Sequence, residues 1–193
     1  MDWFSSITLA NGFYVGVGAG LVLAAAVMIG WRVRSNPSQQ LKRLIKKHSK
    51  ECMSDIVVPD GLDGEIQLDY LLLTPRGLLV LDIKHVNGRL YGGDNMDAWT
   101  VIQGGQRFTF ANPAGPLRER VIAVQSLLQD VPVQGRVVVL GDVKFATGVP
   151  DCVVSLPRLQ EEFAGHSALG KATLSAFYPS WHRMQEIATP ASV

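Results

Sequence analysis

Between Asp2 and Arg32 the sequence contains no charged residue and no histidine, and this run constrains the chain more than any other feature. Residues 12–31 are almost entirely apolar, and about 20 such residues cross a bilayer as a helix. Tyr14 and Trp31 lie near the two ends of the run, where amphipathic rings favour the interface between lipid and water. A cleaved signal peptide would need a basic N-terminal region and a shorter apolar stretch. We therefore expect a retained membrane anchor.

The charges that follow the run predict its orientation. Seven basic residues and no acidic residue lie between positions 32 and 50. Basic segments beside a membrane helix stay on the cytoplasmic side and attract anionic lipid. The sequence thus predicts a single-pass protein of the cell inner membrane, with its N-terminus outside. Residues 1–34 would form the anchor, residues 35–50 a basic juxtamembrane segment and the start of the first helix, and residues 51–193 a cytoplasmic domain.

Composition excludes several other classes of protein. The 193 residues are enough for one domain, and an apolar content of 47% with a net charge of +1 excludes a disordered chain. Two cysteines without pairing or metal-ligand spacing exclude a disulfide scaffold. Residues 51–193 hold 11 basic and 16 acidic residues, so the bulk charge of this part does not favour nucleic acid. Binding to nucleic acid would need a local basic patch.

The pattern after residue 50 predicts a mixed α/β domain. Residues 66–73 and 78–84 have strand patterns, and their runs over residues 71–73 and 78–81 are apolar enough for burial on both faces. Thr74-Pro-Arg-Gly77 between them is a turn sequence. The two segments therefore predict a β-hairpin. Further strands are expected over residues 56–59, 89–91, 99–102, 106–110, 136–140 and 152–156, and helices over residues 39–52, 116–129, 156–163 and 171–177. The tail from Ile187 is expected to be frayed.

Three charged residues interrupt the two apolar strands of this hairpin: Asp69, Asp82 and Lys84. Burying a charge is costly unless it is paired or binds a metal. Alternate residues of a strand share a face, so Asp82 and Lys84 point the same way, and the hairpin lets Asp69 approach Asp82. Two carboxylates suit Mg²⁺, which can make a bound water more acidic, and the lysine can position that water. An ordinary ion pair at a strand end is the alternative explanation.

The order of these residues resembles a known signature. Asp69 followed by Asp82-Ile83-Lys84 is similar to the motif of PD-(D/E)xK nucleases. The surrounding sequence is more similar still to the nuclease-related domain (NERD) family, over roughly residues 39–130. The matching positions are Leu68-Asp69, Gly77, Asp82-Ile83-Lys84, Gly88, Trp99 and Asn112-Pro113.

The resemblance implies a restriction-endonuclease-like core, a mixed sheet flanked by helices, and cleavage of DNA or RNA. It implies that Asp69, Asp82 and the backbone carbonyl of Ile83 hold Mg²⁺ or Mn²⁺, and that Lys84 serves the attacking water. Because nucleases with this core are often dimeric, it leaves a homodimer open. Accessory site candidates are Glu65, Gln67, Glu119 and Gln125, and candidate contacts to nucleic acid are His85, Arg118 and Arg120.

One departure from the family keeps a second function open. Related nucleases often add an acidic residue from the first helix, but here residues 39–52 contain no acid before Glu51. The alternative is a catalytically degenerate module that binds nucleic acid or protein at the membrane. A third hypothesis is a membrane-tethered scaffold that assembles through the apolar segment.

Overall fold

The computed structural model describes residues 36–49, 51–167 and 171–191. The predicted anchor over residues 1–34 lies outside these ranges. Among the described residues, no helix is both long enough and apolar enough to cross a membrane. The described residues from Leu41 onward belong to one compact unit, and the fold described below is that of this unit.

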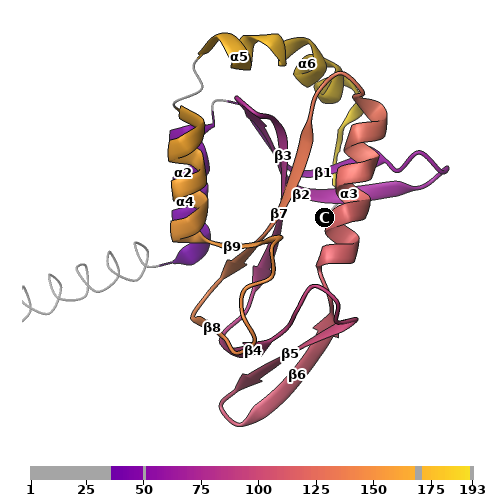
Figure 1. The fold of residues 1–193 in the computed structure, drawn as a ribbon. Helices are drawn as coiled ribbons and strands as arrows, with labels where there is room; N and C mark the ends of the chain where they lie inside the picture. Colours follow the sequence, from indigo (N-terminus) through magenta and orange to yellow (C-terminus); the bar gives the residue numbers. More distant parts are fainter. Residues whose placement is uncertain (1–35, 50, 168–170, 192–193) are drawn as a thin grey trace, which may run out of the picture. The chain divides into compact units, whose positions relative to one another are not determined.

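Two mixed sheets organise the domain (Figure 1). The larger one, sheet A, has the strand order β10-β1-β2-β3-β7-β9. Its strands are β1 (Cys52–Pro59), β2 (Glu65–Thr74), β3 (Gly77–His85), β7 (Val133–Leu140), β9 (Val153–Ser155) and β10 (Thr189–Pro190). Strands β1, β2 and β3 are antiparallel to their neighbours in the hairpins, whereas β3, β7 and β9 run parallel to one another.

The smaller one, sheet B, has the order β6-β5-β4-β8. Its strands are β4 (Gly88–Tyr91), β5 (Ala98–Gln103), β6 (Gln106–Ala111) and β8 (Val143–Phe145). The hairpin of β5 and β6 turns at Gly104 and Gly105, which both have positive φ. This hairpin was predicted from the sequence, whereas the short strand β8 was not.

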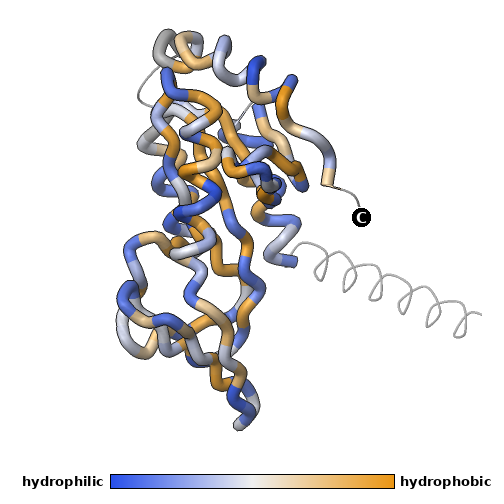
Figure 2. Tube along the Cα trace, turned by 90° about the vertical axis from the view of Figure 1, so that its right-hand side faces the viewer, coloured by the Kyte–Doolittle hydropathy of each residue, from blue (hydrophilic) through white to orange (hydrophobic). Residues whose placement is uncertain are grey.

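Helices cover both faces of sheet A, because its central strands are apolar on both sides. They are α2 (Pro37–His48), α3 (Ala114–Leu127), α4 (Leu156–Ser167), α5 (Lys171–Ala176) and α6 (Tyr178–Ile187). Helices α3 and α6 pack on one face, and α4 with the Leu41 and Ile45 side of α2 packs on the other (Figure 1). Hydrophobic stretches, coloured orange, lie in the interior between the helices (Figure 2).

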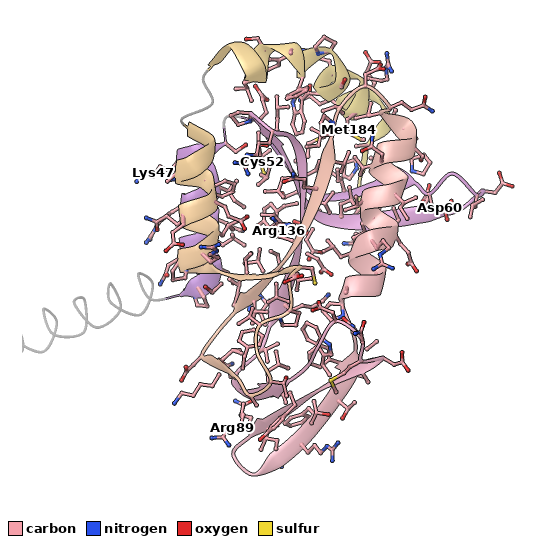
Figure 3. All side chains as sticks on the ribbon, in the orientation of Figure 1. Lys47, Cys52, Asp60, Arg89, Arg136 and Met184 are labelled. Carbon is pink, nitrogen blue, oxygen red and sulfur yellow. The ribbon has the colours of Figure 1, made fainter. Side chains whose placement is uncertain are left out.

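Side chains of β2 and β3 point alternately to the two faces of sheet A. Leu71 and Val80, which face each other across the hairpin, pack with Leu117 and Val124 of α3. The intervening residues Leu72, Leu79 and Leu81 pack with Leu159 and Phe163 of α4. Lys47, on the outer side of α2, points away from the sheet (Figure 3).

The structure corrects two predicted boundaries. The first helix was expected to reach Cys52, but it ends at His48, and Cys52 already begins β1. The side chain of Ser49 is the physical reason. Its hydroxyl donates to the carbonyl oxygens of Glu51 and Leu73, at 2.6 and 3.3 Å, and so turns the chain from the helix into the sheet.

The expectation of a frayed tail from Ile187 is wrong for the described residues up to 191. Trp181 and Met184 of α6 are buried in the core, and Met184 lies on the inner side of that helix (Figure 3). After the helix, Thr189 pairs with Val57 of β1, and the amide of Ala191 donates to the carbonyl of Asp55 at 2.8 Å. The tail therefore completes one edge of sheet A.

Candidate active site

The hairpin of β2 and β3 positions the three charged residues. Thr74 closes its turn by donating from its hydroxyl to the carbonyl of Gly77 at 2.8 Å, and it accepts the amide of Arg76 at 3.2 Å. Gly77 has φ of +111°, and a Cβ there would lie 2.1 Å from the carbonyl oxygen of Pro132. The turn therefore requires glycine, and it fixes the register of the strands down to the pair of Tyr70 with Leu81.

Asp69 lies one residue beyond this last pair and reaches across to β3. Its carboxylate accepts the backbone amide of Ile83 at 2.7 Å. Burial raises the pKa of Asp69, and the nearby charge of Asp82 adds to this rise. The hydrogen bond from Ile83 and the positive charges of Lys84 and Arg120 act in the opposite direction. The charge of Asp82 therefore acts on Asp69, and the hairpin brings the two side chains near each other, as the sequence pattern predicted.

Asp82 is the buried centre of the site, with a side chain that is only 1% exposed. One of its carboxylate oxygens lies 2.8 Å from the ammonium of Lys84, and the other lies 3.5 Å from the guanidinium of Arg120. A carboxylate at this depth is tolerable only because these two cations compensate its lost hydration. The Lys84 side chain is 36% exposed and that of Arg120 is 19% exposed, so the cations face outward from the buried acid.

Arg120 has a larger role than the sequence predicted. It was a candidate contact to nucleic acid, but here its Nε also donates to the carbonyl of Gln67 at 2.8 Å, so that it joins α3 to β2 as well as to Asp82. The spacing of apolar residues in α3 could have placed Arg120 on the side of the helix that faces sheet A. Arg120 stands three residues after Leu117 and four before Val124, and both of these are buried against sheet A.

The Asn112-Pro113 pair and Trp99 brace the start of α3. The Asn112 side chain accepts the amide of Ala114 and donates to three carbonyls of the β4–β5 connection, those of Gly93, Asp94 and Met96. The indole of Trp99 donates to the carbonyl of Gly93 at 3.1 Å. These parts of the sequence motif therefore fix the helix that carries Arg120.

The other predicted site residues lie around this centre without joining it. Gln67 contributes its carbonyl to Arg120, while its side chain is exposed, and Glu65, His85, Arg118 and Glu119 are exposed as well. The structure does not bring Gln125 to Asp82. Its amide group donates to the carbonyls of Leu128 and Val131 and accepts the amide of Val133, and so it holds the connection from α3 to β7.

An open cavity of about 620 Å³ adjoins the site. Lys84, His85 and Arg120 line one part of it, and the β5–β6 hairpin lines another. No group of three or more histidine, cysteine, aspartate or glutamate side chains that could hold a metal occurs in the described part of the chain.

Comparison with known proteins agrees with the motif. No curated protein and no solved structure matches the chain. Residues 30–140, which are more than half of the chain, match the nuclease-related domain, and this range contains Asp69, Asp82, Lys84, Asn112 and Arg120. The chain therefore belongs to the nuclease-related domain (NERD) family.

Proposed function

We propose that the domain hydrolyses phosphodiester bonds of DNA or RNA with the help of a divalent metal ion. The observation that carries this proposal is the convergence of Asp69, Asp82 and Lys84 on one side of the β2–β3 hairpin, within the range that matches a nuclease-related family. The restriction-endonuclease-like core is also a proposal. An antiparallel β1–β2–β3 unit that continues into parallel β7, with helices on both faces, supports it.

The two carboxylates fit a magnesium ion that keeps several water ligands. Mg²⁺ is commonly held by one or two carboxylates together with substrate phosphate. A carboxylate oxygen accepts more than one contact, so neither the Ile83 amide on Asp69 nor the cations on Asp82 exclude the ion. The carbonyl of Ile83 is the proposed third protein ligand. When bound, Mg²⁺ or Mn²⁺ would neutralise phosphate charge and make a bound water more acidic.

The side chains of the protein would supply orientation and positive charge. Asp82 holds the ammonium of Lys84 at 2.8 Å, and the exposed part of Lys84 faces the cavity, where it would position the attacking water. Arg120 lines the same cavity and would stabilise the negative charge that develops on the phosphate. His85 and Arg118 remain candidate contacts farther along the substrate.

The test is metal-dependent cleavage by the full chain in detergent. Labelled single- and double-stranded DNA and RNA would be incubated with Mg²⁺, Mn²⁺ or EDTA. We expect Lys84→Ala and Asp82→Asn to lower the cleavage rate by at least about 100-fold. Lys144→Ala and Asp130→Asn, which change the same residue types at exposed positions, should leave the rate unchanged. Equal activity in all four variants would reject the proposal.

A second function is favoured by the pairing of Asp82. Both of its oxygens contact cations, and among the described residues no third carboxylate joins Asp69 and Asp82 in a metal-binding group, as in a degenerate module that binds nucleic acid or protein without cutting it. Titration with Mn²⁺, followed by its paramagnetic resonance, separates the two functions. An active site should bind Mn²⁺ and lose it in Asp82→Asn, whereas a degenerate site should bind none.

We also propose that residues 1–34 anchor the domain in the inner membrane, with the N-terminus outside and the domain in the cytoplasm. The uncharged run before Arg32 and the seven basic residues after it support this arrangement. Protease added to intact spheroplasts should leave a C-terminal tag uncleaved and should cleave it after lysis. Cleavage before lysis would reverse the orientation.

A further inference from the structure

The cavity beside Asp82 has an aromatic wall that the hydrolytic site does not explain. This wall belongs to the β5–β6 hairpin, in which Phe108 faces Val101 and Phe110 faces Trp99. Because alternate residues of a strand share a face, Phe108 and Phe110 lie on the same side of β6, and both line the cavity.

The two phenylalanines are held differently. Phe110 packs edge-on against the buried Trp99, with ring centroids 6.1 Å apart, and so it belongs to the core. Phe108 is 51% exposed, although it stands on the lined side of the hairpin. An exposed aromatic ring in a cavity offers a face on which a flat ligand can stack.

Another part of the cavity lining is cationic. Lys84 and Arg120 line it, and none of the described residues that line the cavity is acidic. Gln103, in the same lining, adds an amide that can both donate and accept hydrogen bonds. A ligand that fits this wall therefore has an apolar flat part with polar edges, joined to an anionic part. A nucleotide has these parts in this order.

We propose that the cavity receives one unpaired nucleobase, stacked on Phe108, so that the adjoining phosphate lies at Lys84 and Arg120. This inference rests on the proposed function and narrows its substrate to single-stranded nucleic acid or to unpaired ends. A base inside a duplex is stacked on both faces and paired at its edge, so it cannot reach Phe108 without leaving the helix. A volume of about 620 Å³ suits a nucleotide-sized ligand.

Binding measured in EDTA tests the inference separately from catalysis. The full chain in detergent would be titrated with a fluorescent single-stranded dT oligonucleotide, the corresponding dA·dT duplex, and a single strand of the same length with abasic sites. Phe108→Ala should weaken binding of the dT strand by about tenfold, because stacking on one aromatic ring contributes on this scale. Binding of the duplex and of the abasic strand should not change.

Two further variants make the result specific. Ile102→Ala changes an exposed residue on the other face of the same hairpin, and it should leave all three affinities as they are. Phe108→Trp keeps a stacking ring and should restore the affinity for the dT strand. Equal losses for the single strand and the duplex, or no loss in Phe108→Ala, would overturn the inference. Loss of cleavage in Asp82→Asn bears only on the proposed hydrolysis, since that reaction is absent in EDTA.

Discussion

Strands β3 and β6 show how differently the two sheets are built. In β3, the six residues from Gly77 to Asp82 are all buried, and helices lie on both sides. In β6, five of the six residues are exposed, and only Phe110 is partly covered. Sheet A therefore holds its charged residues in a rigid frame, whereas sheet B offers side chains to solvent. The contrast teaches that the same chain holds one strand by burial on both faces and leaves another with most of its side chains in solvent.

The largest expected effect would come from removing core volume in sheet A. Leu71 is a fully buried side chain of β2 that packs against α3. Leu71→Ala leaves a cavity there and should lower the free energy of unfolding by about 2–5 kcal/mol. Ile102→Ala removes a similar volume from sheet B at a side chain that is 40% exposed, and about 1 kcal/mol or less is expected. Urea denaturation of both variants measures the difference. Similar losses would show that sheet B is as tightly determined as sheet A.

The glycine turns of the two hairpins sharpen the comparison. In Gly105→Ala the new methyl group meets no atom within 4 Å, so only the positive φ of +79° is strained, at a cost of about 1–2 kcal/mol. In Gly77→Ala the same kind of backbone strain is joined by a clash with the carbonyl of Pro132 at 2.1 Å. We expect the melting temperature of Gly77→Ala to fall further than that of Gly105→Ala. The reverse order would contradict the assignment of β2–β3 as the rigid hairpin.

The same hairpin shows what the sequence could predict. Continuous leucine and valine runs on either side of a Thr-Pro-Arg-Gly turn leave one simple arrangement, and alternation then places Asp82 beside Lys84. The parallel strand that became β7 was also predicted, from its run of valines. These predictions succeeded because they depend on near neighbours in the chain or on burial alone.

The contact of Arg120 with Asp82 could not be predicted in the same way. It depends on where α3 lies across the sheet, and that position is set by Asn112 and Trp99 through carbonyls of a distant connection. The tail was missed for a related reason. The pair Thr189 and Pro190 has no strand pattern of its own, and it is extended because the edge of β1 is available to it. Tertiary contacts decided both cases.

Removing side-chain hydrogen bonds should also destabilise the surroundings of sheet A more than sheet B, with smaller losses of unfolding free energy. Gln125→Ala removes three hydrogen bonds at the connection from α3 to β7, and the carbonyls left behind should cost about 1–2 kcal/mol. The matched change in sheet B is Thr100→Val, which removes the exposed contact between the hydroxyls of Thr100 and Thr109. This variant should stay within about 0.5 kcal/mol of the parent protein in urea denaturation. A larger loss in Thr100→Val would overturn the ranking.

The smallest expected effect concerns the dependence of stability on pH at the α2–α4 side of sheet A. His48 stacks on Phe163 with ring centroids 5.7 Å apart, and its Nε2 is buried without a hydrogen-bond partner among the described residues. Burial, and then the charge of Lys47, lower the pKa of His48 below its ordinary value of 6.5. The unfolded chain therefore binds a proton more readily than the folded one as pH falls through 6.5, and the folded state loses stability down to the lowered pKa.

His48→Phe keeps a ring against Phe163 but cannot take up a proton. Its free energy of unfolding should therefore fall less than that of the parent protein between pH 7 and pH 5, when urea denaturation is repeated across this range. An unchanged slope in His48→Phe would mean that His48 takes up its proton equally well in the folded state. The α2–α4 side of sheet A would then be as open to solvent at this point as the outer strand of sheet B.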